Sequence, residues 1–288
     1  MSNVLQRLLL FFLGIPAVLA VIVLLPQFDH FAAVAIILVF TGGSALELSR
    51  LFKSRDIPAN PVYLMMLGAG IPASAYVGVL LGGDAALAGA CLSIVLASGS
   101  ALVVLFTRFA FVDAADIRYV LPRANALAFS AAYPGLLGAF IVLIASEPRH
   151  STESLLTFCI LAFSNDSLAW LVGMTLGRRR GIIAVSPNKS VAGFVGGICG
   201  TVGMAFACAA LFPQAIGGAW WATFLLGLAV GAAGIFGDLF ESALKRSAGI
   251  KDSGSAVPGR GGFLDTFDSL LFAAPVFFGL SLILGFFR

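Results

Sequence analysis

The sequence predicts an all-α polytopic membrane protein with about nine transmembrane helices and a cytoplasmic N-terminus. Three observations support this prediction. Of the 288 residues, 60% are hydrophobic and only 11% are charged. The mean hydropathy is +1.03, and a soluble domain does not need so much apolar surface. Apolar runs of about 20 residues, the length that crosses a bilayer as a helix, recur along the whole chain.

Short breaks that contain glycine, proline or charged residues separate the apolar runs. The first run is long for the apolar core of a signal peptide and lacks a convincing cleavage site, so we interpret it as the first transmembrane helix. No soluble domain is inserted between the runs, and we therefore expect residues 1–288 to form a single integral membrane domain. The predicted spans are 4–25, 31–49, 61–82, 85–106, 123–145, 154–176, 192–212, 218–240 and 263–287.

The distribution of Lys and Arg sets the predicted orientation. With the N-terminus in the cytoplasm, all 17 of these residues except Arg149 and Arg288 lie on the cytoplasmic side, as the positive-inside rule requires. Both histidines, His30 and His150, then lie on the outer side. Proton transfer at the cytoplasmic face would therefore depend on carboxylates, water or a metal ion.

Glycines are concentrated in the spans 192–212 and 218–240. Along the second span they recur at spacings of three or four residues, which lets helix backbones approach closely. We interpret these glycines as packing residues, and we expect both spans to be core helices that fix the polar segment following the second.

Charge in this apolar chain is concentrated between Asp238 and Asp268. The window opens with Asp238, Glu241, Ser242 and Lys245, whose spacing places them in one stripe on a helix. Carboxylates at a membrane boundary among apolar neighbours are usually functional. The alternative is an interfacial helix end whose charged side chains reach out to water.

The middle of the window is a basic, glycine-rich loop with Lys251, Asp252 and the run Pro-Gly-Arg-Gly-Gly around Arg260. Glycine backbone can turn its N–H groups toward an anion, and Arg can bind phosphate with a fork. Asp265 and Asp268 follow on the first turn of the last span. One of them could serve only as a helix cap, but two acids opposite Asp238 are typical of a magnesium site.

Two further polar motifs precede the window. Asn165 and Asp166 lie in the middle of the span 154–176, where an ionisable group suggests function and a buried structural hydrogen bond is the alternative. The segment from Ser186 to Ser190 carries Lys189, which could hold a phosphate as a point charge or could only set the topology. Together these motifs predict metal-assisted transfer between phosphate groups, with one substrate in the lipid phase.

The segment Ser242–Asp268 resembles the signature of the phosphatidate cytidylyltransferases, or CDP-diacylglycerol synthases. That signature runs Ser-x-x-Lys-Arg, four residues, Lys-Asp, then Pro-Gly-His-Gly-Gly and Asp-Arg-x-Asp. Asn165–Asp166, the Ser186–Ser190 segment and Gly237–Asp238 resemble further family motifs, so the likeness covers the chain from about Asn165 onward. It implies that residues 151–288 form the catalytic half and residues 1–150 a variable membrane half.

The resemblance implies transfer of CMP from CTP to phosphatidic acid, giving CDP-diacylglycerol and pyrophosphate, with Mg²⁺ and room for a second cation. It implies a location in the bacterial inner (cytoplasmic) membrane, contact with membrane lipids, no nucleic acid partner, and leaves a homodimer open. Asp238, Asp265 and Asp268 would be catalytic, with Asp238 and Asp265 binding metal. The implied substrate-binding residues are Asn165, Asp166, Ser186, Lys189, Ser242, Lys245, Arg246, Lys251, Asp252 and Arg260.

Three positions depart from the family pattern. Arg260 replaces the family His, Thr266 replaces the family Arg, and Ala192 replaces a family Glu. Arg260 cannot shuttle protons, but it can bind phosphate, and our hypothesis is that its charge replaces the one missing at Thr266. These departures leave open a paralogue that uses another lipid phosphate, and a non-catalytic transporter or scaffold is the alternative from another class. The Asp-Gly-x-x-Ala-Arg run of CDP-alcohol phosphotransferases is absent from the sequence.

Overall fold

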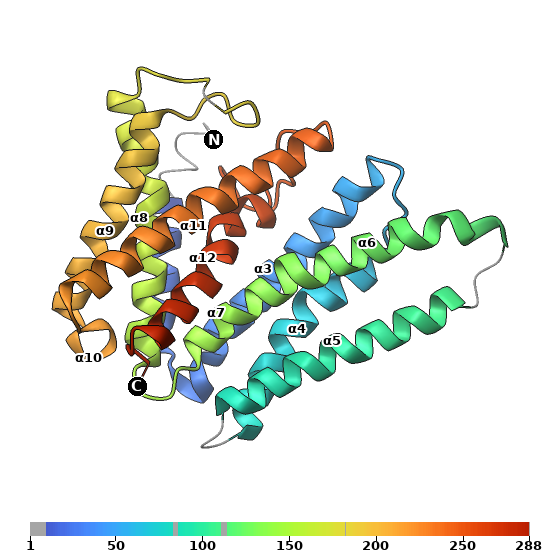
Figure 1. Cartoon of the computed structure of the whole chain (residues 1–288), viewed down its shortest axis with the longest axis horizontal. Helices are drawn as coiled ribbons and strands as arrows, with labels where there is room; N and C mark the ends of the chain where they lie inside the picture. Colours follow the sequence, from blue (N-terminus) through green and yellow to red (C-terminus); the bar gives the residue numbers. More distant parts are fainter. Residues whose placement is uncertain (1–9, 83–85, 111–113, 182, 288) are drawn as a thin grey trace.

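The computed structural model describes residues 10–82, 86–110, 114–181 and 183–287, and helices joined by loops make up this part of the chain (Figure 1). No strand forms among these residues, and the only extended pairings are two isolated bridges, Arg180 with Ser190 and Val257 with Gly261. Residues 4–9 of the first predicted span, including Arg7, lie outside the described residues, as does Arg288. The prediction of an all-α polytopic membrane protein is confirmed.

Seven of the described helical segments are long and apolar enough to cross a membrane, and two shorter apolar segments, Phe12–Leu24 and Ala88–Gly99, accompany them. All coincide with predicted spans, whereas the orientation stays a prediction. The elements are η1 (Leu10–Gly14), α2 (Ile15–Leu24), α3 (Gln27–Lys53), α4 (Pro61–Gly82), α5 (Ala86–Ala110), η3 (Ala114–Tyr119), α6 (Val120–Ser130), η4 (Ala131–Leu136), α7 (Leu137–Ala145), α8 (Ser151–Leu176), α9 (Val191–Leu211), α10 (Pro213–Ile216), α11 (Trp220–Ser247) and α12 (Phe263–Ile283).

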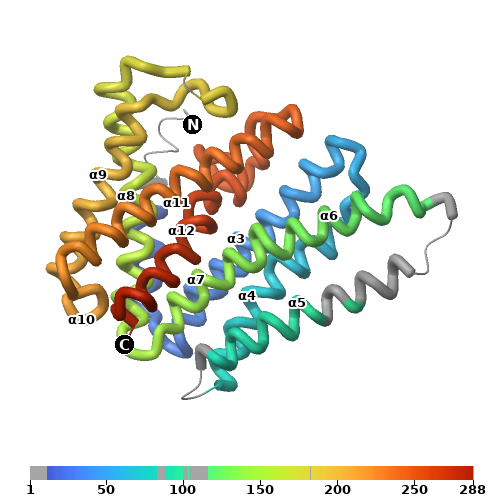
Figure 2. Tube along the Cα trace, in the orientation of Figure 1, coloured from blue at the N-terminus to red at the C-terminus, as the bar shows by residue number. Residues whose placement is uncertain are grey.

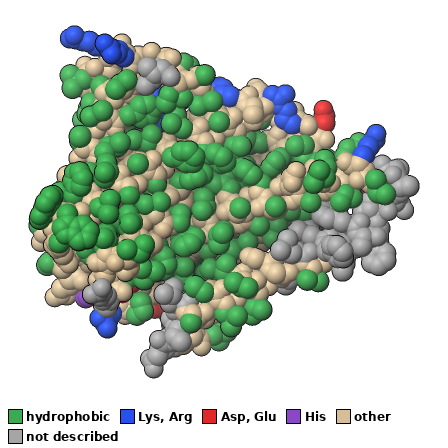
Figure 3. All heavy atoms as spheres, viewed as in Figure 1, with side chains coloured by type: hydrophobic (Ala, Val, Ile, Leu, Met, Phe, Trp, Pro, Cys, Tyr) green, Lys and Arg blue, Asp and Glu red, His purple; other side chains and the backbone are tan. Residues whose placement is uncertain are grey.

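The last helix, α12, lies in the middle of the molecule, where it packs against α11, α3, α7 and α8. Helices α8 and α9 lie on one side of it, and α4 and α5 lie on the other (Figure 2). Apolar side chains cover most of the face in Figure 3, and Lys and Arg gather mainly along one edge. This arrangement brings the polar residues that begin α12 between the two sides of the fold.

The glycines of α9 and α11 serve packing, as predicted. A Cβ added at Gly197 or Gly234 would come within 2.6 and 2.8 Å of the Asn165 side-chain amide, respectively. The Asn165 amide in turn donates to the carbonyl of Gly231 at 3.3 Å. The expectation that both helices are core helices is wrong for α9. Only 22% of an apolar 18-residue stretch of this helix is buried, and the helix lies at the edge of the molecule (Figure 1). Its glycines from Gly193 to Gly200 face α8, whereas α11 approaches α9 through its own glycines, Gly227 and Gly231.

Candidate active site

A polar pocket of about 610 Å³ lies between α8, α11, the start of α9 and the start of α12. Its lining includes seven of the predicted site residues, which come from four separate parts of the sequence. They are Asn165, Asp166, Lys189, Asp238, Arg260, Asp265 and Asp268. The prediction that these motifs share one place is therefore confirmed for this set.

One wall of the pocket is the loop between α8 and α9. The Arg180–Ser190 bridge holds the two ends of the loop together, and the Ser190 hydroxyl accepts the Gly193 N–H at 3.1 Å, which caps α9. This anchoring places Lys189 beside α11, where its ammonium group forms an ion pair with the carboxylate of Asp238. Both side chains remain partly exposed, so a ligand in the pocket can reach them.

A second ion pair lies deeper, between the loop before α12 and the middle of α8. The Nη2 atom of Arg260 lies 2.5 Å from Oδ2 of Asp166, and the Ser269 hydroxyl donates to Oδ1 of the same carboxylate at 3.3 Å. Burial lowers the pKa of the Arg260 guanidinium, but Asp166 and Asp268 raise it, and the net result lies above its ordinary value. Arg260 therefore carries a fixed positive charge into the pocket.

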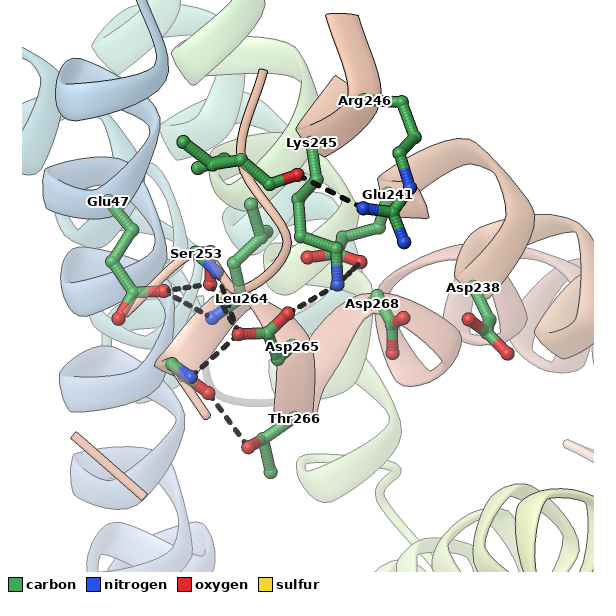
Figure 4. Close-up of polar contacts among 12 residues, drawn as sticks. Glu47, Asp238, Glu241, Lys245, Arg246, Ser253, Leu264, Asp265, Thr266 and Asp268 are labelled. Carbon is green, nitrogen blue, oxygen red and sulfur yellow. Dashed lines mark hydrogen bonds and ion pairs between the residues drawn. The ribbon is translucent and has the colours of Figure 1, made fainter. Parts of the chain in front are cut away.

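Asp265 lies at the centre of a hydrogen-bond network at the start of α12 (Figure 4). Its Oδ1 atom is 2.5 Å from Nζ of Lys245, and the same ammonium is 2.5 Å from Oε2 of Glu241. Its Oδ2 atom accepts the N–H and the hydroxyl of Ser253, both at 2.9 Å, and the N–H of Gly262 at 2.7 Å. The capping role that we kept as an alternative is thus present for Asp265.

Glu47 of α3 was not predicted as a site residue, yet it supports this network from the N-terminal half. Its carboxylate accepts the N–H groups of Phe263 and Leu264, each at 2.9 Å. It also lies 2.7 Å from the Ser253 hydroxyl and shares that single donor with Asp265. The residue is only 3% exposed. The available signal was a carboxylate inside an apolar span, which alone suggests a role.

The carboxylates of Asp238 and Asp268 line the same pocket and point the same way in Figure 4. Asp268 accepts the N–H of Ser269 at 2.6 Å. Among the described residues, no group of three His, Cys, Asp or Glu side chains could hold a metal ion. Mg²⁺, however, is commonly bound by one or two carboxylates together with substrate phosphates. The pocket therefore fits Mg²⁺ only with a phosphate-bearing ligand.

The remaining predicted residues do not line this pocket. Lys245 is linked to the pocket only through Asp265, to which its ammonium group donates a hydrogen bond. Arg246 is exposed and donates to the carbonyls of Val185 and Ile250 at 3.5 and 3.4 Å. The others are half-buried or exposed away from the lining, namely Ser186, Ser242, Lys251 and Asp252.

Of the three departures, Arg260 has the clearest structural consequence, through its pair with Asp166. The Thr266 hydroxyl donates to the Gly262 carbonyl at 2.9 Å, within its own helix. Ala192 is half-buried in the first turn of α9, and nothing in the structure explains its replacement of Glu. Thr266 thus brings no charge to the acid-bearing turn.

A phosphatidate cytidylyltransferase from Bacillus subtilis (strain 168) is 36% identical over 156 residues, which cover 54% of this chain and 56% of the relative. One from Thermotoga maritima is 43% identical over 114 residues, 38% of this chain and 42% of the relative. The uncharacterized protein YnbB of Escherichia coli (strain K12) is 41% identical over 127 residues, 43% and 42% of the two chains.

In these pairwise matches the chain spans about half the length of the curated relatives it matches. The family comparison reaches further, since the model of the cytidylyltransferase family matches residues 5–284. That range includes every residue of the pocket as well as Glu47. The chain belongs to the cytidylyltransferase family.

Proposed function

We propose that the protein transfers CMP from CTP to phosphatidic acid at the cytoplasmic face of the membrane, producing CDP-diacylglycerol and pyrophosphate. The observation that carries the proposal is the pocket of about 610 Å³, with acidic and basic side chains together among membrane helices. Membership of the cytidylyltransferase family supports the nucleotide, and relatives named phosphatidate cytidylyltransferase support the lipid.

Of the three basic residues that line the pocket, Arg180, Lys189 and Arg260, the last two would bind phosphate. Lys189 and Arg260 are each held by one carboxylate, Asp238 and Asp166 respectively. A phosphate oxygen would compete with that carboxylate for the same cation. Arg260 can offer several N–H donors in a planar fork, whereas Lys189 acts as a point charge. The two side chains therefore suit different phosphates.

Mg²⁺ would be held by Asp238 and Asp268 together with substrate phosphates. This proposal differs from the sequence prediction, which paired Asp238 with Asp265, because the oxygens of Asp265 already accept four hydrogen bonds. When bound, the ion would neutralise charge on the phosphates and on the leaving group. Asp265 would instead hold the first turn of α12, and thereby Asp268, in place.

In the reaction, an oxygen of the lipid phosphate attacks the α-phosphorus of CTP. The bond between that phosphorus and the oxygen bridging to the β-phosphorus breaks, and pyrophosphate leaves with the electron pair. A phosphate monoester is largely ionised near neutral pH, since its second pKa is about 6, so a strong general base is unnecessary. The pocket lining, within the described part of the chain, contains no histidine, which agrees with this mechanism.

The test uses purified protein in detergent micelles with labelled CTP, Mg²⁺ and phosphatidic acid, and measures label in the organic phase. Lys189→Met should reduce transfer roughly tenfold or more, since hydrogen bonds to charged groups contribute about 1.5–3 kcal/mol. Lys53→Met removes an exposed cation outside the pocket and should leave transfer unchanged. If label enters the organic phase only when another lipid phosphate replaces phosphatidic acid, the protein is a paralogue with a different substrate. If no lipid phosphate gives labelled lipid, the proposal is overturned.

A further inference from the structure

A second cavity, of about 280 Å³, lies on the other side of the α8–α12 wall from the polar pocket. Side chains from α2, α3, α7, α8 and α12 line it, and nearly all are apolar, including Val18, Ala33, Ile36 and Phe163. The charged residue in its lining is Arg260, and Thr266 is also polar. An apolar cavity with a cation in its wall is complementary to an amphiphile with an anionic head.

The two cavities are built on the same two helices. On α12, Asp265, Asp268 and Ser269 line the polar pocket, whereas Thr266, Phe267 and Leu270 line the apolar cavity. On α8, the polar pocket has Asn165 and Asp166, and the apolar cavity has Leu155, Cys159 and Phe163. Different stretches and faces of these helices thus separate a polar space from an apolar one.

Arg260 lines both spaces. Its Nη2 atom pairs with Asp166 on the polar side, and a guanidinium carries five N–H donors in all. An anion bound by Arg260 would lie where the apolar cavity meets the pocket that holds the acidic residues. A chain attached to that anion could extend into the apolar cavity while the anion faces the nucleotide.

We propose that the apolar cavity binds an acyl chain of the lipid substrate, and that Arg260 holds the lipid phosphate at the junction of the two cavities. This inference rests on the proposed function and names the subsite for its lipid. At roughly 30 Å³ for each methylene-sized group, a value close to the volume of water in the liquid, the cavity takes about nine such groups. It therefore accommodates part of one chain, and the rest of the lipid remains in the bilayer.

The test measures kcat/KM for phosphatidic acids of increasing chain length, at equal surface concentration in mixed micelles. Each buried methylene contributes about 0.8 kcal/mol, or roughly fourfold, until the cavity is full. Ala33→Leu adds three carbons to the lining. The increase of kcat/KM with chain length should therefore end about three methylenes earlier than in the wild type. Ala35→Leu makes the same substitution on α3 outside the cavity lining and should leave the profile unchanged.

A second variant covers the case in which Ala33→Leu fails to fold, because Ala33 is 7% exposed. Ile36→Ala enlarges the cavity, so kcat/KM should continue to increase for about three more methylenes of chain length. In addition, Arg260→Gln should raise the KM for phosphatidic acid at least tenfold and leave CTP binding, measured calorimetrically, within twofold. A wild type that transfers no CMP would refute the proposed function. An active wild type whose chain-length profile is the same in the cavity variants would refute this inference alone.

Discussion

The buried carboxylate of Glu47 offers the sharpest test of how the acid-bearing turn is held. Replacing Glu47 with Ala removes the acceptor of the Phe263 and Leu264 N–H groups, which begin α12. The Ser253 hydroxyl keeps its bond to Asp265, so two backbone donors lose their partner. A buried donor without an acceptor costs about 1–3 kcal/mol, and we therefore expect Glu47→Ala to lower the free energy of unfolding by about 2–6 kcal/mol.

Glu47→Gln removes the negative charge of the side chain and keeps its size. The amide retains one oxygen acceptor but turns an NH₂ group toward the donors. The free energy of unfolding of this variant should therefore lie between those of the wild type and the alanine variant. Glu153→Ala is the matched control, because Glu153 is a half-buried glutamate in the first turn of α8. Removing its interaction with the helix dipole should cost no more than about 0.3–1 kcal/mol.

Unfolding can be followed by tryptophan fluorescence in mixed micelles with increasing SDS. The transfer assay, run well below the unfolding midpoint, then reports on positioning, and the Mg²⁺ concentration for half-maximal activity should rise in Glu47→Gln. That readout separates a displaced Asp268 from a loss of folded protein. A Glu47→Ala variant with wild-type stability and wild-type Mg²⁺ dependence would refute the role assigned to the carboxylate.

Three further predictions concern the same turn. Asp265→Asn should lower stability by about 1–3 kcal/mol through the lost charged acceptor, as well as activity; a fully active, equally stable variant would contradict the capping role. Gly262→Ala would place its Cβ against the Glu47 carboxylate, at a cost of about 1–3 kcal/mol; combined with Glu47→Ala, the unfolding losses should be less than additive. Arg260→His should reduce CMP transfer, and adding Thr266→Arg should restore part of it; no effect of either on the assay would exclude charge compensation.

The helices were predictable because apolar runs and their polar breaks determine where a chain can cross a bilayer. The predicted span 123–145 matches a helical segment that includes Pro134 in a π-helical turn. The placement of α9 was not predictable from its glycines. Close backbone approach requires glycine on one face only, so the same pattern suits a helix at the edge of a bundle.

The site was predictable as a set of residues and not as a set of contacts. Asp238, Lys189 and Arg260 line one pocket as expected, but the sequence does not say which carboxylate faces which cation. That choice depends on how α8 and the loop before α12 meet in space. Glu47 was missed for the same reason, since its partners lie more than 200 positions away in the sequence.

The charges of the pocket explain how nucleotide and cation binding would depend on each other. Lys189 is paired with Asp238, so a phosphate that takes the ammonium group leaves the carboxylate without its counter-charge. That is the state in which Asp238 would bind Mg²⁺, and binding of either ligand would therefore favour the other by the reciprocity of linked equilibria. The same reasoning applies to Arg260 and Asp166. The Asp166 side chain is half-buried, however, and less exposed than that of Asp238 (24% against 36%), so leaving its carboxylate unpaired is more costly. The lipid phosphate must therefore share Arg260 with Asp166 rather than replace it, which a guanidinium with several donors allows and a lysine would not.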